Sequence, residues 1–245
     1  MAKRYKKTKK STTIFLFIFI VMLIVSGYKI LQWKLNSNEN KKILQEVQNV
    51  VTIDEEKNTY IINFKFLKQR NSDTIAWIKV NGTNIEYPIV QTENNSYYMR
   101  HNLNKEYNVA GWIFMDYKNK LDGNDKNIVI YGHNMHDDSM FGTLRNILEE
   151  DWYNNEQNYV LNFITEKENL KYRVFSVYKI ENEDYYIKTE FEETEFSEFV
   201  ETLKNRSIKN FNVEVTPEDS ILTLSTCADN NKYRIVLHAK KMSEE

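Results

Sequence analysis

The chain contains a single cysteine, Cys227, at the end of the apolar run 221–227. A lone thiol cannot form a disulfide within its own chain, so it is a buried hydrophobic residue, half of an intermolecular bridge or a reactive nucleophile. The surrounding residues favour the nucleophile, because His133 ends another apolar run and Arg234 opens the run that follows the cysteine. A thiol, an imidazole and a guanidinium together predict acyl transfer through a covalent intermediate on sulfur.

The spacing of Cys227 and Arg234 predicts that they meet across a hairpin. Six residues separate them, and the polar stretch 229–232 is typical of a hairpin loop. If the two strands pair antiparallel around this loop, the residues lie directly opposite, with Cβ atoms about 5 Å apart. A guanidinium there lowers the pKa of the thiol and donates hydrogen bonds to an oxyanion. The alternative is an ordinary hairpin with an exposed arginine.

Position along the chain distinguishes the four histidines. His133 directly follows a predicted strand, where a chain leaves a sheet and functional sites usually form. His136 is expected in solvent, and His101 in a loop where it bonds to backbone. His238 shares a strand with Arg234 but lies about 13 Å along it, too far to act on the thiol. His133 is therefore the candidate acid and base, although a lone histidine is more often structural.

The N-terminal residues predict a membrane segment. Residues 3–10 hold six cations and no acid, and they precede the uncharged apolar stretch 14–25. With its continuation to Trp33, this segment offers about 20 residues, enough to cross roughly 30 Å of hydrocarbon. The positive-inside rule places residues 1–13 in the cytoplasm and the rest of the chain outside. A cleaved signal peptide is the alternative, but no small-x-small site follows Val25, which favours an uncleaved anchor.

The charge of the remaining chain excludes nucleic acid as a partner. Residues 34–245 carry 26 cations against 35 acids, a net charge of −9. No basic stripe with interleaved aromatic residues occurs there. About 210 residues outside the membrane suffice for one domain with a sizeable core.

Periodicity indicates the elements that position the candidate residues. From Thr74 the chain changes to short β-branched and aromatic runs, with Asn81-Gly82 as a hairpin signal. These runs predict strands at 75–80, 84–90, 111–115, 127–131, 159–164, 171–180, 220–226 and 233–240. Apolar faces predict helices at 40–51, 55–69, 140–150 and 195–205. The number of strands favours a closed or nearly closed barrel.

Three motifs in this order resemble the sortase family. The residues TLSTC at 223–227 resemble the TLxTC signature of sortases, and the serine in the variable place resembles class B. The residues YGHN at 131–134 match the segment that carries the sortase histidine, and Arg234 opens the next strand as the sortase arginine does. Segments 71–78, 87–90 and 110–116 resemble strands of that family. The resemblance covers roughly residues 40–241.

The resemblance implies an eight-stranded sortase-type β-barrel, mainly β, with two N-terminal helices and a helix in the connection 181–219 before the cysteine strand. It divides the chain into a basic cytoplasmic tail, a transmembrane anchor, N-terminal helices and a catalytic barrel, at 1–13, 14–33, 34–70 and 71–245. The loop from Cys227 to Arg234 is short for class B. No acid cluster resembles the calcium site of class A, so neither a metal nor a cofactor is expected.

The implied activity is that of a membrane-anchored cysteine transpeptidase on the outer face of a Gram-positive cell. Such an enzyme cleaves a sorting motif near the C-terminus of a secreted protein and transfers it to an amine of a cell-wall peptidoglycan precursor or of a pilin. Cys227 would attack the carbonyl of the motif's threonine and hold a thioester, His133 would transfer the protons, and Arg234 would stabilise the oxyanion or the bound peptide. Ser225 shares a face with Cys227 and could bond the substrate; a ladder residue with a solvated hydroxyl is the alternative.

Other protein classes stay open as alternatives. The sequence around the cysteine of an L,D-transpeptidase is different. It has Gly before the cysteine and Arg two residues after it, whereas Thr226 and Asp229 occupy those places here. A papain-like peptidase has its cysteine upstream of its histidine, which is the reverse of this order. An exported cysteine endopeptidase that hydrolyses wall or surface peptides, or a membrane-tethered binding module with an incidental thiol, are the remaining alternatives.

Overall fold

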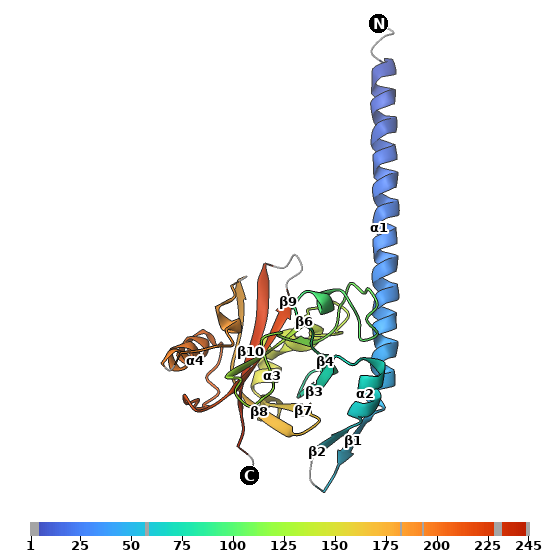
Figure 1. The fold of residues 1–245 in the computed structure, drawn as a ribbon. Coiled ribbons are helices and arrows are strands. Elements are labelled where there is room, and N and C mark those ends of the chain that lie inside the picture. Colours follow the sequence, from blue (N-terminus) through green and yellow to red (C-terminus); the bar gives the residue numbers. More distant parts are fainter. Residues whose placement is uncertain (1–4, 57–58, 182, 193, 228–231, 244–245) are drawn as a thin grey trace.

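One long N-terminal helix stands beside a β-barrel in the computed structural model of the chain (Figure 1). The structure describes residues 5–56, 59–181, 183–192, 194–227 and 232–243. The strands are β1 (Val51–Asp54), β2 (Thr59–Ile62), β3 (Thr74–Val80), β4 (Glu86–Val90), β5 (Phe114–Met115), β6 (Asn127–His133), β7 (Val160–Thr165), β8 (Asn169–Glu181), β9 (Ile221–Cys227) and β10 (Tyr233–Lys241). The α-helices are α1 (Tyr5–Gln48), α2 (Phe64–Arg70), α3 (Glu150–Tyr153) and α4 (Glu195–Arg206). The short 3-10 helices are η1 (Tyr97–Met99), η2 (Gly142–Leu148), η3 (Glu156–Tyr159) and η4 (Tyr185–Ile187).

The barrel is closed and has the strand order β10-β8-β7-β3-β4-β5-β6-β9, with β9 pairing back onto β10. Neighbouring strands are antiparallel except for β4 with β5 and β6 with β9, which are parallel. The eight strands predicted from the sequence all occur, which confirms the eight-stranded barrel. The strand expected at 111–115 is reduced to the two residues of β5.

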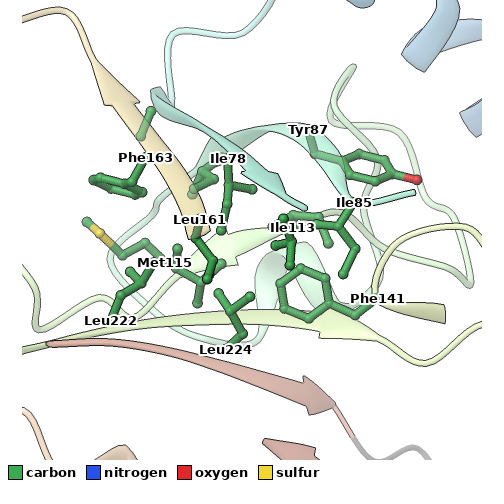
Figure 2. Packing of buried hydrophobic residues seen from close by; sticks show 14 of the residues in the cluster. Ile78, Ile85, Tyr87, Ile113, Met115, Phe141, Leu161, Phe163, Leu222 and Leu224 are labelled. Carbon is green, nitrogen blue, oxygen red and sulfur yellow. The ribbon is translucent and has the colours of Figure 1, made fainter. Parts of the chain in front are cut away.

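Large apolar side chains fill the barrel, and Figure 2 shows how those from opposite walls meet. The interior residues shown there include Ile78, Ile85, Ile113, Met115, Phe141, Leu161, Phe163, Leu222 and Leu224. Each is almost completely buried, and burial of one such side chain stabilises a fold by about 1.5–3 kcal/mol. The strands are therefore held rigidly up to their ends, where the candidate residues lie.

The segment between α1 and β3 corrects one prediction. A helix is expected at 55–69, but β1 and β2 form a hairpin there, and helix begins only with α2. The expectation rests on Ile61, Phe64 and Leu67, whose spacing fits one helical face. Ile61 belongs to β2 and is exposed, whereas Phe64 and Leu67 lie on α2 and are buried. The three-residue spacing of these apolar side chains therefore made the end of β2 and the start of α2 look like one helix.

The other predicted helices occur with changed bounds. The helix expected at 40–51 is the last part of α1, and the helix expected at 195–205 is α4. The segment 140–150 forms the 3-10 helix η2, followed directly by α3. Helix α4 packs over β8 and β10 with a second apolar cluster on the outside of the barrel. The connection before the cysteine strand thus covers one outer wall, as expected for its helix.

Candidate active site

His133 and Cys227 are the last residues of two adjacent parallel strands. The pairing of β6 with β9 runs without a shift from Asn127 opposite Ile221 to His133 opposite Cys227. Neighbouring strands lie about 4.8 Å apart, so the register brings the two backbones together at one end of the barrel. We call the end at which β6 and β9 terminate the site end.

Two glycines explain how the chain turns beside His133. A Cβ atom on Gly132 would lie 2.5 Å from Ile113 Cδ1 and 2.7 Å from the ring of Phe141. A Cβ atom on Gly142 would lie 2.4 Å from the carbonyl oxygen of Met135. The missing side chains let the barrel interior and the loop after β6 close tightly around the strand end, and this packing fixes where His133 leaves the sheet.

The ring of His133 is buried and hydrogen-bonded to the backbone. Its exposed fraction is 5%, and Nε2 lies 2.9 Å from the carbonyl oxygen of Met99. A carbonyl oxygen only accepts, so Nε2 is the nitrogen that carries a hydrogen in this contact. Nδ1 is the ring nitrogen that is not engaged with this carbonyl. The contact also fixes the ring orientation, as a base or acid requires.

Arg234 lies near the start of β10 and has a buried donor. Strand β10 pairs with β9 from Lys240 opposite Ile221 to Val236 opposite Ser225. Continuing this register by two residues would bring Arg234 opposite Cys227, as the hairpin prediction requires. Its Nη1 is buried without a hydrogen-bond partner among the residues that the structure describes. A buried guanidinium donor of this kind is costly unless a bound group completes it. The predicted loop is 229–232, and most of it lies outside the described residues, because the structure does not describe 228–231.

The two threonines of the TLSTC segment hold strands together. Thr226 Oγ1 accepts a hydrogen bond of 3.0 Å from the backbone N–H of Ile235 and so fastens the end of β9 to β10. Thr223 Oγ1 donates to Asn127 Oδ1 at 2.7 Å, across to the start of β6. The motif therefore fixes the strand that carries Cys227 against both of its neighbours.

Ser225 is buried rather than solvated. Its exposed fraction is 1%, and its hydroxyl lies 2.9 Å from the hydroxyl of Tyr186 in η4. The alternative of a ladder residue with a solvated hydroxyl is therefore wrong. The hydroxyl pair links β9 to the connection that covers the outer wall.

Two of the remaining histidines have partners that account for them. His238 is fully buried, with Nε2 at 2.9 Å from Tyr178 Oη and Nδ1 at 2.8 Å from Thr223 Oγ1. Burial lowers the pKa of His238 from its usual 6.5 to about 3, so the ring is neutral. His101 Nδ1 lies 2.7 Å from the carbonyl oxygen of Tyr97, as expected for a loop residue that bonds to backbone.

Two contacts of the site could not be predicted from the sequence. Met99 approaches His133 through its carbonyl oxygen, which carries no signal of residue type. Tyr186 lies in an acidic, aromatic stretch that has no spacing relation to Ser225. Both contacts join segments distant in sequence, so only the folded barrel reveals them.

Comparison with known families agrees with this geometry. The model of the sortase domain matches residues 78–242. Sortase B of Staphylococcus aureus (strain NCTC 8325 / PS 47) is 32% identical over 240 residues, which cover 96% of this chain and 98% of that protein. Sortase B of Listeria monocytogenes serovar 1/2a (strain ATCC BAA-679 / EGD-e) is 35% identical over 237 residues, with 93% and 95% covered.

Solved structures show the same likeness. The crystal structure of sortase B from B. anthracis in complex with AAEK1 superposes with a TM-score of 0.76 at 37% identity, covering 86% of this chain and 99% of that chain. The Staphylococcus aureus sortase B–substrate complex gives a TM-score of 0.70 at 30% identity, covering 90% and 98%. A matching family model, similar relatives over nearly their full length and a shared closed barrel lead to one assignment. The chain belongs to the sortase family as a class B sortase, and its activity is that of a cysteine transpeptidase.

Proposed function

We propose that Cys227, His133 and Arg234 form the catalytic site and that α1 anchors this site to the cell membrane. Sortases act on proteins that bear a sorting motif and on amine nucleophiles. For this chain we propose a motif near the C-terminus of a secreted protein as the substrate. The acceptor is an amine of a cell-wall peptidoglycan precursor or of a pilin. The observation that carries the proposal is the register that pairs His133 with Cys227 at the site end.

The proposed first step forms a thioester. The Cys227 thiolate attacks the carbonyl carbon of the motif's threonine, and the C–N bond to the following residue breaks. The imidazolium of His133 gives its proton to the departing amine. The hydrogen bond from Nε2 to Met99 supports this role, because it holds the ring so that Nδ1 exchanges the proton.

The second step transfers the acyl group. Neutral His133 accepts a proton from the incoming amine, whose nitrogen attacks the thioester carbonyl and releases the thiolate. Both steps pass through a tetrahedral oxyanion, and a guanidinium N–H aimed at it lowers the barrier. The buried Nη1 of Arg234 supports this assignment, because no described residue accepts its hydrogen bond. Ser225 is proposed to bond the bound peptide, which requires its hydroxyl to leave or share the contact with Tyr186.

The proposed anchor is the N-terminal part of α1. Within the described residues, α1 is the helix long and apolar enough to cross a membrane, over Ser11–Gln48. A signal sequence near an N-terminus meets the same criterion. An uncleaved anchor is supported by the continuity of α1 and by burial of its C-terminal part, including Ile43 and Val47, against the barrel. We therefore propose a cytoplasmic tail at 1–13, a single span at 14–33, and an extracellular catalytic barrel at 71–245. Between the span and the barrel, residues 34–70 hold the end of α1, the β1–β2 hairpin and α2.

The decisive experiment follows the fate of the acyl group. Full-length protein in detergent is mixed with a peptide that carries a sorting motif, without an added amine, and intact mass is recorded. We expect slow hydrolysis and an acyl adduct on Cys227. An oligoglycine or diaminopimelate-type amine should then raise turnover and give a ligated product with ping-pong kinetics. Equal cleavage with and without every amine, with neither adduct nor ligated product, would assign the chain to the cysteine endopeptidases instead.

Topology has an independent test. Protease added to intact protoplasts should digest the barrel, because residues after the span are proposed to lie outside. Digestion only after lysis would contradict the proposed orientation. An N-terminus at residue 1 in the mature membrane fraction, read by mass spectrometry, separates the uncleaved anchor from a removed signal peptide.

A further inference from the structure

Helix α1 fixes the direction in which the active site points. It runs unbroken from Tyr5 to Gln48, contains no proline, and has one glycine, Gly27. A helix without a proline or another break curves only gently over its length, so it largely keeps its direction. The orientation of the barrel relative to the N-terminal part of α1 is therefore set by where its C-terminal part is attached.

The attachment begins at the site end. Ser37 donates a hydrogen bond to Asp137, which lies four residues beyond His133 in the loop after β6. Asn40 exchanges hydrogen bonds with the buried amide of Asn108 and donates to the carbonyl oxygen of Gly111 at 3.3 Å. These contacts are buried or half-buried, so this turn of α1 is fixed to loops around the site rather than loosely apposed.

The attachment continues toward the opposite end of the barrel. Glu46 forms an ion pair of 2.6 Å with Arg70, which ends α2 just before β3. Strand β3 runs in the same direction as β6, so its first residue lies at the end where β6 begins. Moving from Ser37 to Glu46 therefore means moving from the site end to the far end. The N-terminal half of α1 must project beyond the site end, as Figure 1 shows.

The distance from the proposed span to this attachment is short. Trp33 closes the predicted span, and Ser37 is the first buried residue of α1 from Ser11 onward. Four residues of helix rise by about 6 Å. Resting on the proposed membrane anchor, this spacing leads us to propose that the site end of the barrel faces the headgroup layer of the outer leaflet at close range.

Charge indicates that the helix, and not attraction to lipid, enforces this proximity. Residues 34–245 carry a net charge of −9, which gives no general affinity for an anionic surface. The proximity should therefore persist at high salt and without anionic lipid.

The test compares labels at the two ends of the barrel. Single cysteines replace His136, an exposed residue in the loop after β6, or Asn124, an exposed residue just before β6 begins, in a Cys227→Ser background. Each full-length variant carries a fluorophore and is reconstituted into phosphatidylcholine vesicles with nitroxide-labelled headgroups. Because seven residues of strand span about 20 Å, quenching at 136 should exceed quenching at 124 by at least about threefold.

Three further variants separate the possible outcomes. A label in Leu23→Cys reports insertion of the span through quenching by lipids labelled deep in the acyl chain. Leu35→Pro should break the rigid link and remove the difference between 136 and 124, whereas Leu35→Ala should preserve it. Quenching at 23 with equal quenching at 136 and 124 overturns the proposed orientation alone. No quenching at 23 overturns the anchor and the orientation together, while the acyl-transfer assay remains an independent test of the catalytic proposal.

Discussion

The site end around His133 and the region around His238 in the middle of β10 both contain polar side chains, but their hydrogen bonding differs. His238 lies in a cluster with Tyr178, Thr223 and Asn127, in which both ring nitrogens have buried partners. At the site end, Arg234 has a buried donor for which no described residue provides an acceptor. A completed network stabilises one arrangement of strands, and an incomplete one leaves a donor available to a bound group. The comparison separates polar residues that hold the barrel from those that we propose to act on a substrate.

The largest expected difference is in activity. Cys227→Ala should abolish both cleavage and transfer, because no other cysteine exists to form the thioester. His238→Gln should keep kcat per folded molecule, since His238 lies in the other region. Adduct mass and product yield, normalised to folded protein, measure both variants. A large loss of kcat in His238→Gln with unchanged folding would break the comparison.

Arg234→Lys should lower kcat/KM by about 10²–10³, because a point charge does not reproduce the planar donors that meet an oxyanion. Arg173→Lys is the matched control, since Arg173 is a half-exposed arginine of β8 beside Glu156. Steady-state kinetics on both variants, with thermal unfolding as a check, make the measurement. Near-normal turnover in Arg234→Lys would mean that the guanidinium does not face the reacting carbonyl.

The buried neutral ring of His238 should make the stability of the protein depend on pH. The folded pKa of about 3 lies below the unfolded value of 6.5, so only the unfolded chain binds a proton between these values. Neutral His238 makes its full contribution to the free energy of unfolding above pH 6.5. As the pH falls from 6.5 toward 3, this contribution declines by about 1.4 kcal/mol per pH unit. Chemical unfolding of wild type and His238→Gln across this window should show the slope in their difference. Parallel curves would contradict the buried neutral ring.

The smallest expected effect is that of Ser225→Ala, which tests whether Ser225 both stabilises the barrel and binds the substrate. Ser225→Ala should cost about 1 kcal/mol of stability through loss of the contact with Tyr186. If Ser225 also bonds the substrate, KM should rise in Ser225→Ala, and the rise should remain in the Tyr186→Phe background. A double-mutant cycle on stability and on KM separates the two contributions. An unchanged KM would leave Ser225 in the structural region alone.

Most of the barrel follows from local sequence signals. Alternating apolar residues and turn residues such as Asn81-Gly82 mark strands wherever one side of a strand faces the core. The helix predicted at 55–69 was wrong. Ile61, Phe64 and Leu67 follow one another at three-residue spacing, which fits a single helix and equally a strand followed by a helix. Only pairing of β1 with β2 decides between these, and pairing is not encoded in periodicity.

The candidate site was predictable in its residue types but not in its contacts. The hairpin spacing correctly predicts antiparallel pairing of β9 with β10, because a short loop fixes the pairing of its strands. The meeting of Arg234 with Cys227 stays a prediction. The partner of His133 is a carbonyl oxygen, and that of Ser225 is a tyrosine from a distant connection. Such contacts depend on how loops close over the barrel, which no local pattern specifies.

The parallel pairing of β6 with β9 has a consequence for the order in which the protein can fold. These strands are separated by roughly a hundred residues, so their contacts form late and contribute to slow folding. Strand β10 then inserts between β8 and β9, and without it both would be open edges available to other chains. A chain that lacks β10 therefore has an open barrel with two unpaired strand edges. If Arg234 has the proposed role, catalytic competence arises only once β10 is in place.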